Sequence, residues 1–107
     1  AMYDDWLFEN GDVQSIGKIF WACGKLGVRI PALFDKPNDR AEWLFDQGNP
    51  ESISSILWAC GKLGIPSPRL FDELDKNAEW FLENGNEKTI AASVWACQQL
   101  GRQSRLV

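Results

Sequence analysis

Residues 49–64 show the spacing of a helix that is buried on one side. Apolar residues recur in the i, i+3, i+4, i+7 pattern of a buried stripe, at Ile53, Ile56, Leu57, Cys60 and Leu63. Asn49 is a favourable N-cap, Pro50 suits the first helical position, and Gly64 suits the left-handed residue after a helix. The pattern predicts a helix that is capped at both ends.

A second apolar stripe predicts another helix over residues 68–84. Ser67 precedes this stretch as a candidate N-cap, and Gly85 marks its end. Pro37 stands 37 residues before Leu74, and it lacks the N–H that would bond the carbonyl of Leu33, so we expect a break or kink there. The apolar side of the helix is predicted to comprise Leu70, Phe71, Leu74, Ala78, Phe81 and Leu82.

Both patterns recur with a period of 37 residues. Each repeat is thus predicted to have a first helix, of the kind at 68–84, followed by a second helix, of the kind at 49–64. The letters WACGKLG occur at 21–27 and 58–64, and WACQQLG occurs at 95–101. All six tryptophans and all three cysteines follow this period, and Asp12 and Asn86 occupy the N-cap position of Asn49 in the other units. A fixed period of this length is typical of a repeat protein.

We therefore expect an all-α fold, because strand signals are absent. The predicted architecture is an α-solenoid of helix–turn–helix repeats, with about two and a half repeats and five to six helices in a right-handed superhelix. It forms a single unit over 1–107, divided into a partial repeat at 1–30, a repeat at 31–67 and a repeat at 68–107. The chain reads as a piece of a longer array.

The tryptophans lie off the buried stripes. At 100° per residue, Trp58 is about 140° from the middle of the apolar stripe. Small residues flank it one turn away, at Ser54 and Gly61. A ring packed over small residues at the junction with the adjacent repeat explains this choice, and Trp80 is predicted to face the neighbouring first helix. The alternative is a row of partly exposed rings that serve as stacking platforms for bases, each contributing about 1–3 kcal/mol.

The cysteines are predicted to be small core residues. The chain contains no histidine, which makes a zinc site implausible. Equivalent positions in neighbouring repeats lie about 10 Å apart, which is too far for a disulfide. Three free thiols suit a reducing compartment. We expect no metal and no cofactor.

Composition and charge narrow the partners. No apolar run reaches the roughly 20 residues that span a bilayer, so we expect no membrane partner. The net charge is −4, but it is unevenly distributed. The first-helix segments at 1–11, 31–48 and 68–85 hold 12 acidic and 4 basic residues, and the remainder holds 3 acidic and 7 basic residues. One surface is thus predicted to be acidic and the other mildly basic.

The outer stripe of each second helix keeps its tryptophan while the polar neighbours change. A constant platform beside a variable polar residue is typical of helical repeats that read one base each, although drift of surface residues gives the same pattern. The candidate RNA-binding residues are Gln14, Lys18, Trp21, Lys25, Glu51, Ser55, Trp58, Lys62, Lys88, Trp95 and Gln99. The four lysines would meet phosphates, the tryptophans would offer stacking edges, and the other four would tune base preference.

The tryptophan–Ala–x–x–x–Leu–Gly ending of the second helix resembles the octotricopeptide repeat, and related helical pairs occur in RAP-domain and FAST-kinase-like organelle proteins. The resemblance covers essentially the whole chain. It implies an α-solenoid that binds single-stranded RNA in a chloroplast or mitochondrion and helps to stabilise, process or translate transcripts. One departure is that RAEW at 40–43 and NAEW at 77–80 stand where many such units have a proline-rich stretch.

Two other classes of function were weighed. An enzyme is not expected, because the chain has neither histidine for a Ser/His/Asp or Cys/His arrangement nor a glycine-rich phosphate loop. A scaffold that binds a protein or peptide is the stronger alternative, because stacked helix pairs offer extended grooves. The leading hypothesis is single-stranded RNA binding along the second helices.

Overall fold

A computed structural model describes the backbone of residues 2–106 and the side chains of residues 6–106. Within this range all regular structure is helical, which confirms the all-α prediction. The helices are α1 (Met2–Asn10), α2 (Val13–Leu26), α3 (Pro31–Asp39), α4 (Ala41–Gln47), α5 (Pro50–Leu63), α6 (Pro68–Lys76), α7 (Ala78–Asn84) and α8 (Glu87–Gln99). Eight helices stand where five to six were predicted, so the predicted count is wrong.

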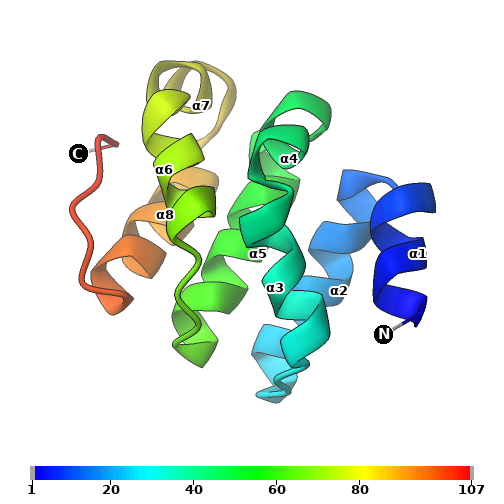
Figure 1. The fold of residues 1–107 in the computed structure, drawn as a ribbon. Coiled ribbons are helices and arrows are strands. Elements are labelled where there is room, and N and C mark those ends of the chain that lie inside the picture. Colours follow the sequence, from blue (N-terminus) through cyan, green and yellow to red (C-terminus); the bar gives the residue numbers. More distant parts are fainter. Residues whose placement is uncertain (1, 107) are drawn as a thin grey trace.

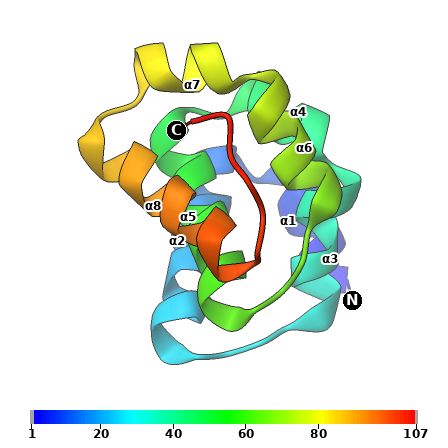
Figure 2. The ribbon, with the colours of Figure 1, turned by 90° about the vertical axis from the view of Figure 1, so that its left-hand side faces the viewer.

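The helices form two layers. The long-helix layer consists of α2, α5 and α8, and α5 packs between the other two (Figure 1). The short-helix layer consists of α1, α3, α4, α6 and α7. Figure 2 shows the two layers side by side in a view turned by 90°. The chain crosses from one layer to the other after each long helix, so residues one period apart occupy equivalent places.

The long helices begin and end where the sequence predicts. The side chains of Asp12, Asn49 and Asn86 each accept a hydrogen bond from the backbone N–H three residues on, at 2.7–2.9 Å. The bond from Ser15 lowers the pKa of the Asp12 carboxyl. The residues that follow α2 and α5, Gly27 and Gly64, have φ values of 69° and 67°, which a glycine adopts without steric cost.

The predicted first helix is in fact two short helices. A single helix over 68–84 was expected, but α6 ends and α7 begins at Asn77. The preceding unit divides in the same way at Arg40. The backbone φ angles there are −107° and −113°, which interrupt the helical path. This division accounts for the larger number of helices.

Proline is not the common cause of the division. Pro37 lies inside α3, three residues before the break, and the prediction of a break at Pro37 itself is wrong. The third unit has Leu74 at that position and still divides at Asn77. There the Asn77 side chain donates a hydrogen bond of 2.8 Å to the backbone carbonyl of Glu73, which also accepts the Asn77 backbone N–H at 3.0 Å.

The two layers enclose one apolar core. All five predicted stripe residues of α5 are buried, and five of the six predicted for residues 68–84 are buried as well. Leu82 is the exception, because it is exposed. Ser67 is buried and makes no capping bond; its hydroxyl instead lies 3.7 Å from the sulfur of Cys60.

The segment after α8 packs against the short-helix layer. The Arg102 guanidinium lies 2.9 Å from a carboxylate oxygen of Asp72 and 5.5 Å from the ring centre of Phe71. Leu106 is buried. In Figure 2 this segment, drawn in red, crosses the end of the stack between α8 and α6. In the part of the chain that the structure describes, no helix is long and apolar enough to cross a membrane.

Candidate nucleic-acid interface

The tryptophans of the three long helices form a continuous row, here called the tryptophan ladder. The ring centroids of Trp21 and Trp58 are 6.5 Å apart, and those of Trp58 and Trp95 are 6.4 Å apart. The planes of the two pairs are inclined by 30° and 29°. The ladder arises because the 37-residue period brings the same helical position of α2, α5 and α8 together.

The ladder also joins neighbouring long helices. A Cβ atom added to Gly24 would lie 2.5 Å from an atom of the Trp58 six-membered ring, so this ring lies directly over the glycine of the preceding unit. Gly61 takes the same role toward α8, where an added Cβ would lie 2.7 Å from the Cα of Ala96. The prediction that a tryptophan ring packs over a small residue at the junction is thus confirmed for Trp58, whereas Ala96 rather than Trp95 lies closest to Gly61.

The rings nevertheless remain partly accessible. Trp21 keeps 49% of its surface exposed, and Trp58 and Trp95 are half-buried. The three rings therefore form a continuous, partly exposed aromatic strip across α2, α5 and α8.

Most of the predicted site residues reach solvent. Ser55 is half-buried, like Trp58 and Trp95. The other eight are exposed, and they are Gln14, Lys18, Trp21, Lys25, Glu51, Lys62, Lys88 and Gln99. The sequence pattern thus identified a solvent-facing stripe on each long helix.

A groove of about 540 Å³ lies on this face and gathers a subset of the stripe. Six of the eleven predicted residues line it, namely Trp21, Lys25, Glu51, Ser55, Trp58 and Lys88. The other five, namely Gln14, Lys18, Lys62, Trp95 and Gln99, are not part of this lining. The structure therefore brings two of the four candidate phosphate-binding lysines together around one hollow, here called the ladder groove.

Sequence reasoning missed four residues that also line the ladder groove. They are Ser54, Asn86, Thr89 and Ala92. Asn86 and Thr89 form a reciprocal capping box at the start of α8, with both bonds at 2.9 Å. The N-cap assignment of Asn86 was the available signal. Each stripe follows a single helix, whereas α2, α5 and α8 together line the groove, so the stripes alone do not reveal it.

Charge and aromatic character meet at Lys25. Its ammonium nitrogen lies 5.5 Å from the centre of the Trp21 ring, within the range of a cation–π contact. Lys88 from α8 lines the same groove, and Glu51 contributes the opposite charge. The groove therefore offers two cations, one carboxylate and two indole rings to a ligand.

The cysteines take no part in this face. Cys23, Cys60 and Cys97 are buried and unpaired, as predicted for small core residues. Burial raises the pKa of all three thiols, and that of Cys60 reaches about 11. A thiol with a raised pKa is a poor nucleophile near neutral pH. Among the residues described, no group of histidine, cysteine and carboxylate side chains is placed to hold a metal ion.

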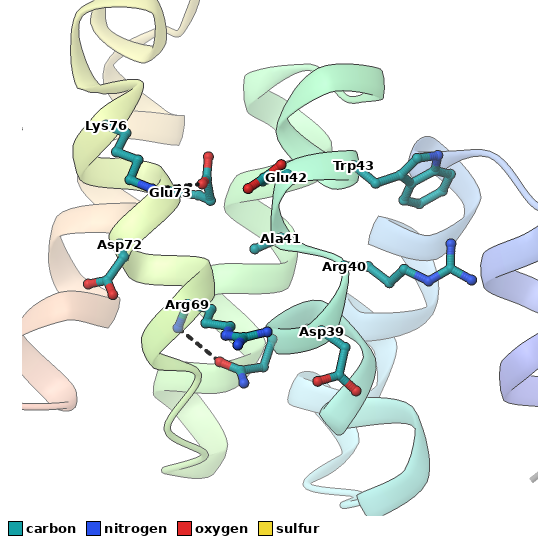
Figure 3. A pocket seen from close by; sticks show the side chains of 10 residues that line it. Asp39, Arg40, Ala41, Glu42, Trp43, Arg69, Asp72, Glu73 and Lys76 are labelled. Atoms are coloured by element: carbon teal, nitrogen blue, oxygen red, sulfur yellow. Dashed lines mark hydrogen bonds and ion pairs between the residues drawn. The ribbon is translucent and has the colours of Figure 1, made fainter.

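A second groove lies on the short-helix layer, opposite the ladder. It measures about 690 Å³ and lies between α3–α4 and α6. Figure 3 shows that Glu42 and Glu73 face this space from the two sides, while Arg40 and Trp43 point away from α6. The backbone N–H of Arg69 donates a 2.9 Å hydrogen bond to the Asn38 side chain across the junction. This surface carries acidic and basic groups together.

Comparison of the chain with protein-family models, with curated proteins and with solved structures found no match.

Proposed function

We propose that the chain is a segment of an α-solenoid that binds single-stranded RNA along its long-helix layer. The observation that carries the proposal is the ladder groove, which Lys25 and Lys88 line together with Trp21 and Trp58. Cations that follow a backbone beside aromatic side chains are the usual means of binding single strands. The 37-residue period, together with the ordered packing of α2, α5 and α8, supports the solenoid.

The arrangement also supports a division of labour within each unit. Trp58 is held in place by Gly24 and by both neighbouring rings, so it supplies a fixed aromatic ring. Glu51 and Ser55 lie beside it on the same helix and differ from their counterparts in the other units. In this proposal the polar residues select among bases, and the lysines bind the phosphates.

The resemblance to octotricopeptide repeats supports the same substrate and adds a cellular setting. It favours a role in a chloroplast or mitochondrion, in the processing, stability or translation of transcripts. The phrase that carries this resemblance, at 21–27, 58–64 and 95–101, contains the ladder tryptophans themselves.

The test is a titration of fluorescent single-stranded RNA pools at about 50 and 200 mM salt. The variant Lys25→Glu/Lys88→Glu removes both groove cations. For single strands each phosphate contact contributes about 0.7 to the salt slope, so the slope should fall by about 1.4. Binding should weaken most at the lower salt concentration.

The matched control is Arg69→Glu/Lys76→Glu, which makes the same change in net charge on the short-helix layer. Both side chains are exposed and line the opposite groove. We expect this control to bind RNA with nearly unchanged slope. Equal weakening by both variants, or no binding by the unaltered protein at low salt, would contradict the proposal.

A protein-binding scaffold is the second candidate, and the groove of about 690 Å³ on the short-helix layer favours it. Glu42 and Glu73 face this groove, which suits a basic peptide. A labelled Lys/Arg-rich peptide should bind the unaltered protein and lose affinity with Glu42→Lys/Glu73→Lys. No loss with this variant would exclude the groove as the binding surface.

A further inference from the structure

The two ends of the long-helix layer differ in what they offer a neighbour. At one end α2 packs against one long helix, α5, whereas α5 packs against a long helix on each side (Figure 1). At the other end α8 has Gln98 at the position that glycine occupies in α2 (Gly24) and α5 (Gly61). The two junctions inside the layer show how these residues affect the packing of a neighbouring helix.

Apolar residues that a preceding unit covers elsewhere are open at the α2 end. Leu26 is 76% exposed, whereas its counterpart Leu63 is 5% exposed. Val28 is exposed and its counterpart Ile65 is half-buried. Trp21 is more exposed than Trp95, although each has one ladder neighbour. The difference follows because Trp95 has a preceding long helix beneath it.

The same comparison defines what would fit on this face. Wherever one long helix follows another, the earlier helix carries glycine at the contact. An added Cβ at Gly24 would meet the Trp58 ring at 2.5 Å, and one at Gly61 would meet the Ala96 backbone at 2.7 Å. A helix that covers Trp21 in the same register must therefore have glycine at this position.

Gln98 prevents the chain from supplying that helix itself. Gln98 has the Cβ atom that the two junctions exclude, followed by a long polar side chain, and it is exposed. A second copy that stacked its α2 on this α8 would bring Trp21 and Ala22 against Gln98. Overpacking of this kind is destabilising.

We propose that the open face of α2 docks one further helix pair of the same repeat, which carries glycine at the Gly24 position. The face continues the α2–α5 and α5–α8 interfaces, and Gln98 excludes a second copy of this chain as the occupant. The proposal rests on the repeat architecture proposed above and is independent of RNA binding.

The test adds one period to the chain. A copy of residues 39–75 placed directly before Met2 is in register, because Met2 is equivalent to position 76, and it sets a copy of α5 with its glycine against α2. We expect the midpoint of urea unfolding to rise and iodide quenching of Trp21 to fall. Quenching of Trp21 is read as the difference between each protein and its Trp21→Phe counterpart.

A matched variant carries Gly61→Gln in the added copy only. It should lose most of the gain in unfolding midpoint and leave Trp21 as quenchable as in the original chain. A gain that is equal with and without this substitution would overturn the glycine requirement. Unchanged quenching of Trp21 in the extended protein would overturn the docking face.

An internal duplication, in which residues 1–67 are followed by 31–107, separates this proposal from the repeat architecture. If the duplication folds and the extension does not protect Trp21, the docking face is wrong while the stacking of units stands. If both added periods remain unfolded, the architecture fails and the docking proposal fails with it.

Sedimentation equilibrium tests whether a second copy of the chain occupies the open face of α2. The unaltered chain should remain monomeric, and Gln98→Gly should associate head to tail with a mass that rises with concentration. The control Gln99→Gly changes the neighbouring exposed glutamine and should stay monomeric. Association of the unaltered chain through Trp21 would show that a second copy occupies the face, which would overturn the proposal.

Discussion

The long-helix and short-helix layers use the same 37-residue period in different ways. Each long helix is continuous for 13 or 14 residues and has a side-chain cap at its N-terminus. The corresponding first helix is divided at Arg40 or Asn77, and neither α4 nor α7 has a side-chain cap. The helices that have side-chain caps at their N-termini are therefore the ones that run without a break.

The difference also extends to the contacts between units. Long helices approach closely enough that a Cβ at Gly24 or Gly61 would collide with the next unit. Units of the short-helix layer instead meet through larger side chains, such as Phe45 and Trp80, whose ring centroids are 6.5 Å apart. Close approach needs small residues, and the two layers differ in having them.

The largest expected effect breaks the long-helix layer. Trp58→Ala should lower the free energy of unfolding by about 3 kcal/mol, because it removes a ring packed between two helices. Trp21→Ala should cost about 1 kcal/mol, because half of this ring is already in water. Urea unfolding followed by circular dichroism measures both values. Equal costs would show that the junction packing of Trp58 adds nothing.

A pH series tests the core beneath the long-helix layer. The pKa of the Cys60 thiol is raised to about 11 in the folded protein, from 9.0. The favoured neutral thiol therefore stabilises the fold below pH 9, and this contribution is lost as pH rises toward 11. The loss should be about 2–3 kcal/mol.

The measurement is urea unfolding between about pH 8 and pH 11, with Cys60→Ala as the reference for other titrating groups. The difference in free energy of unfolding between the two proteins should narrow or reverse as the pH rises, because only the unaltered protein loses the contribution of the Cys60 thiol. A constant difference would show that the Cys60 thiol titrates alike in the folded and unfolded chain.

The substitution Pro37→Leu tests whether proline causes the division between α3 and α4. Leucine fills this position in the third unit, where Leu74 is fully buried, so it should fit. The free energy of unfolding should rise by about 1–2 kcal/mol, because the substitution restores a helical N–H. Backbone chemical shifts at Arg40 should remain non-helical. Fusion of α3 and α4 into one helix would show that proline causes the division in that unit.

The smallest effect compares the helix starts of the two layers. Asn49→Ala removes the side-chain oxygen that accepts the Ser52 N–H at 2.8 Å, and it should cost about 1 kcal/mol. Arg40→Ala, at the uncapped start of α4, should stay within about 0.5 kcal/mol of the original. Thermal unfolding distinguishes them. Similar losses would contradict the role assigned to capping in the long-helix layer.

Local signals predicted the long helices well. Asn49 predicts the start of a helix, Gly64 predicts its end, and the apolar stripe between them predicts its buried side. All three predictions hold for α5. The period then placed equivalent caps at Asp12 and Asn86. These features depend on residues within four positions of one another, so the sequence contains the information directly.

The division of the first helix was not predicted. The apolar stripe around Leu70, Leu74 and Ala78 continues across Asn77 without interruption, so periodicity gives no sign of a break. Proline suggested the wrong position in the other unit. Only the folded chain showed that the two units divide at equivalent positions despite different residues there.

The sequence by itself determined the helical class, the 37-residue period, the caps and the residues exposed on the long helices, because these follow from local hydrogen bonding and from spacing along one helix. The tertiary structure decided which exposed residues meet. Lys25 and Lys88 share a groove while Lys18 and Lys62 lie outside it, and Trp58 rests on Gly24 of the preceding unit. Such choices depend on the offset between neighbouring helices, which arises from packing across the core and is not encoded in any single helix.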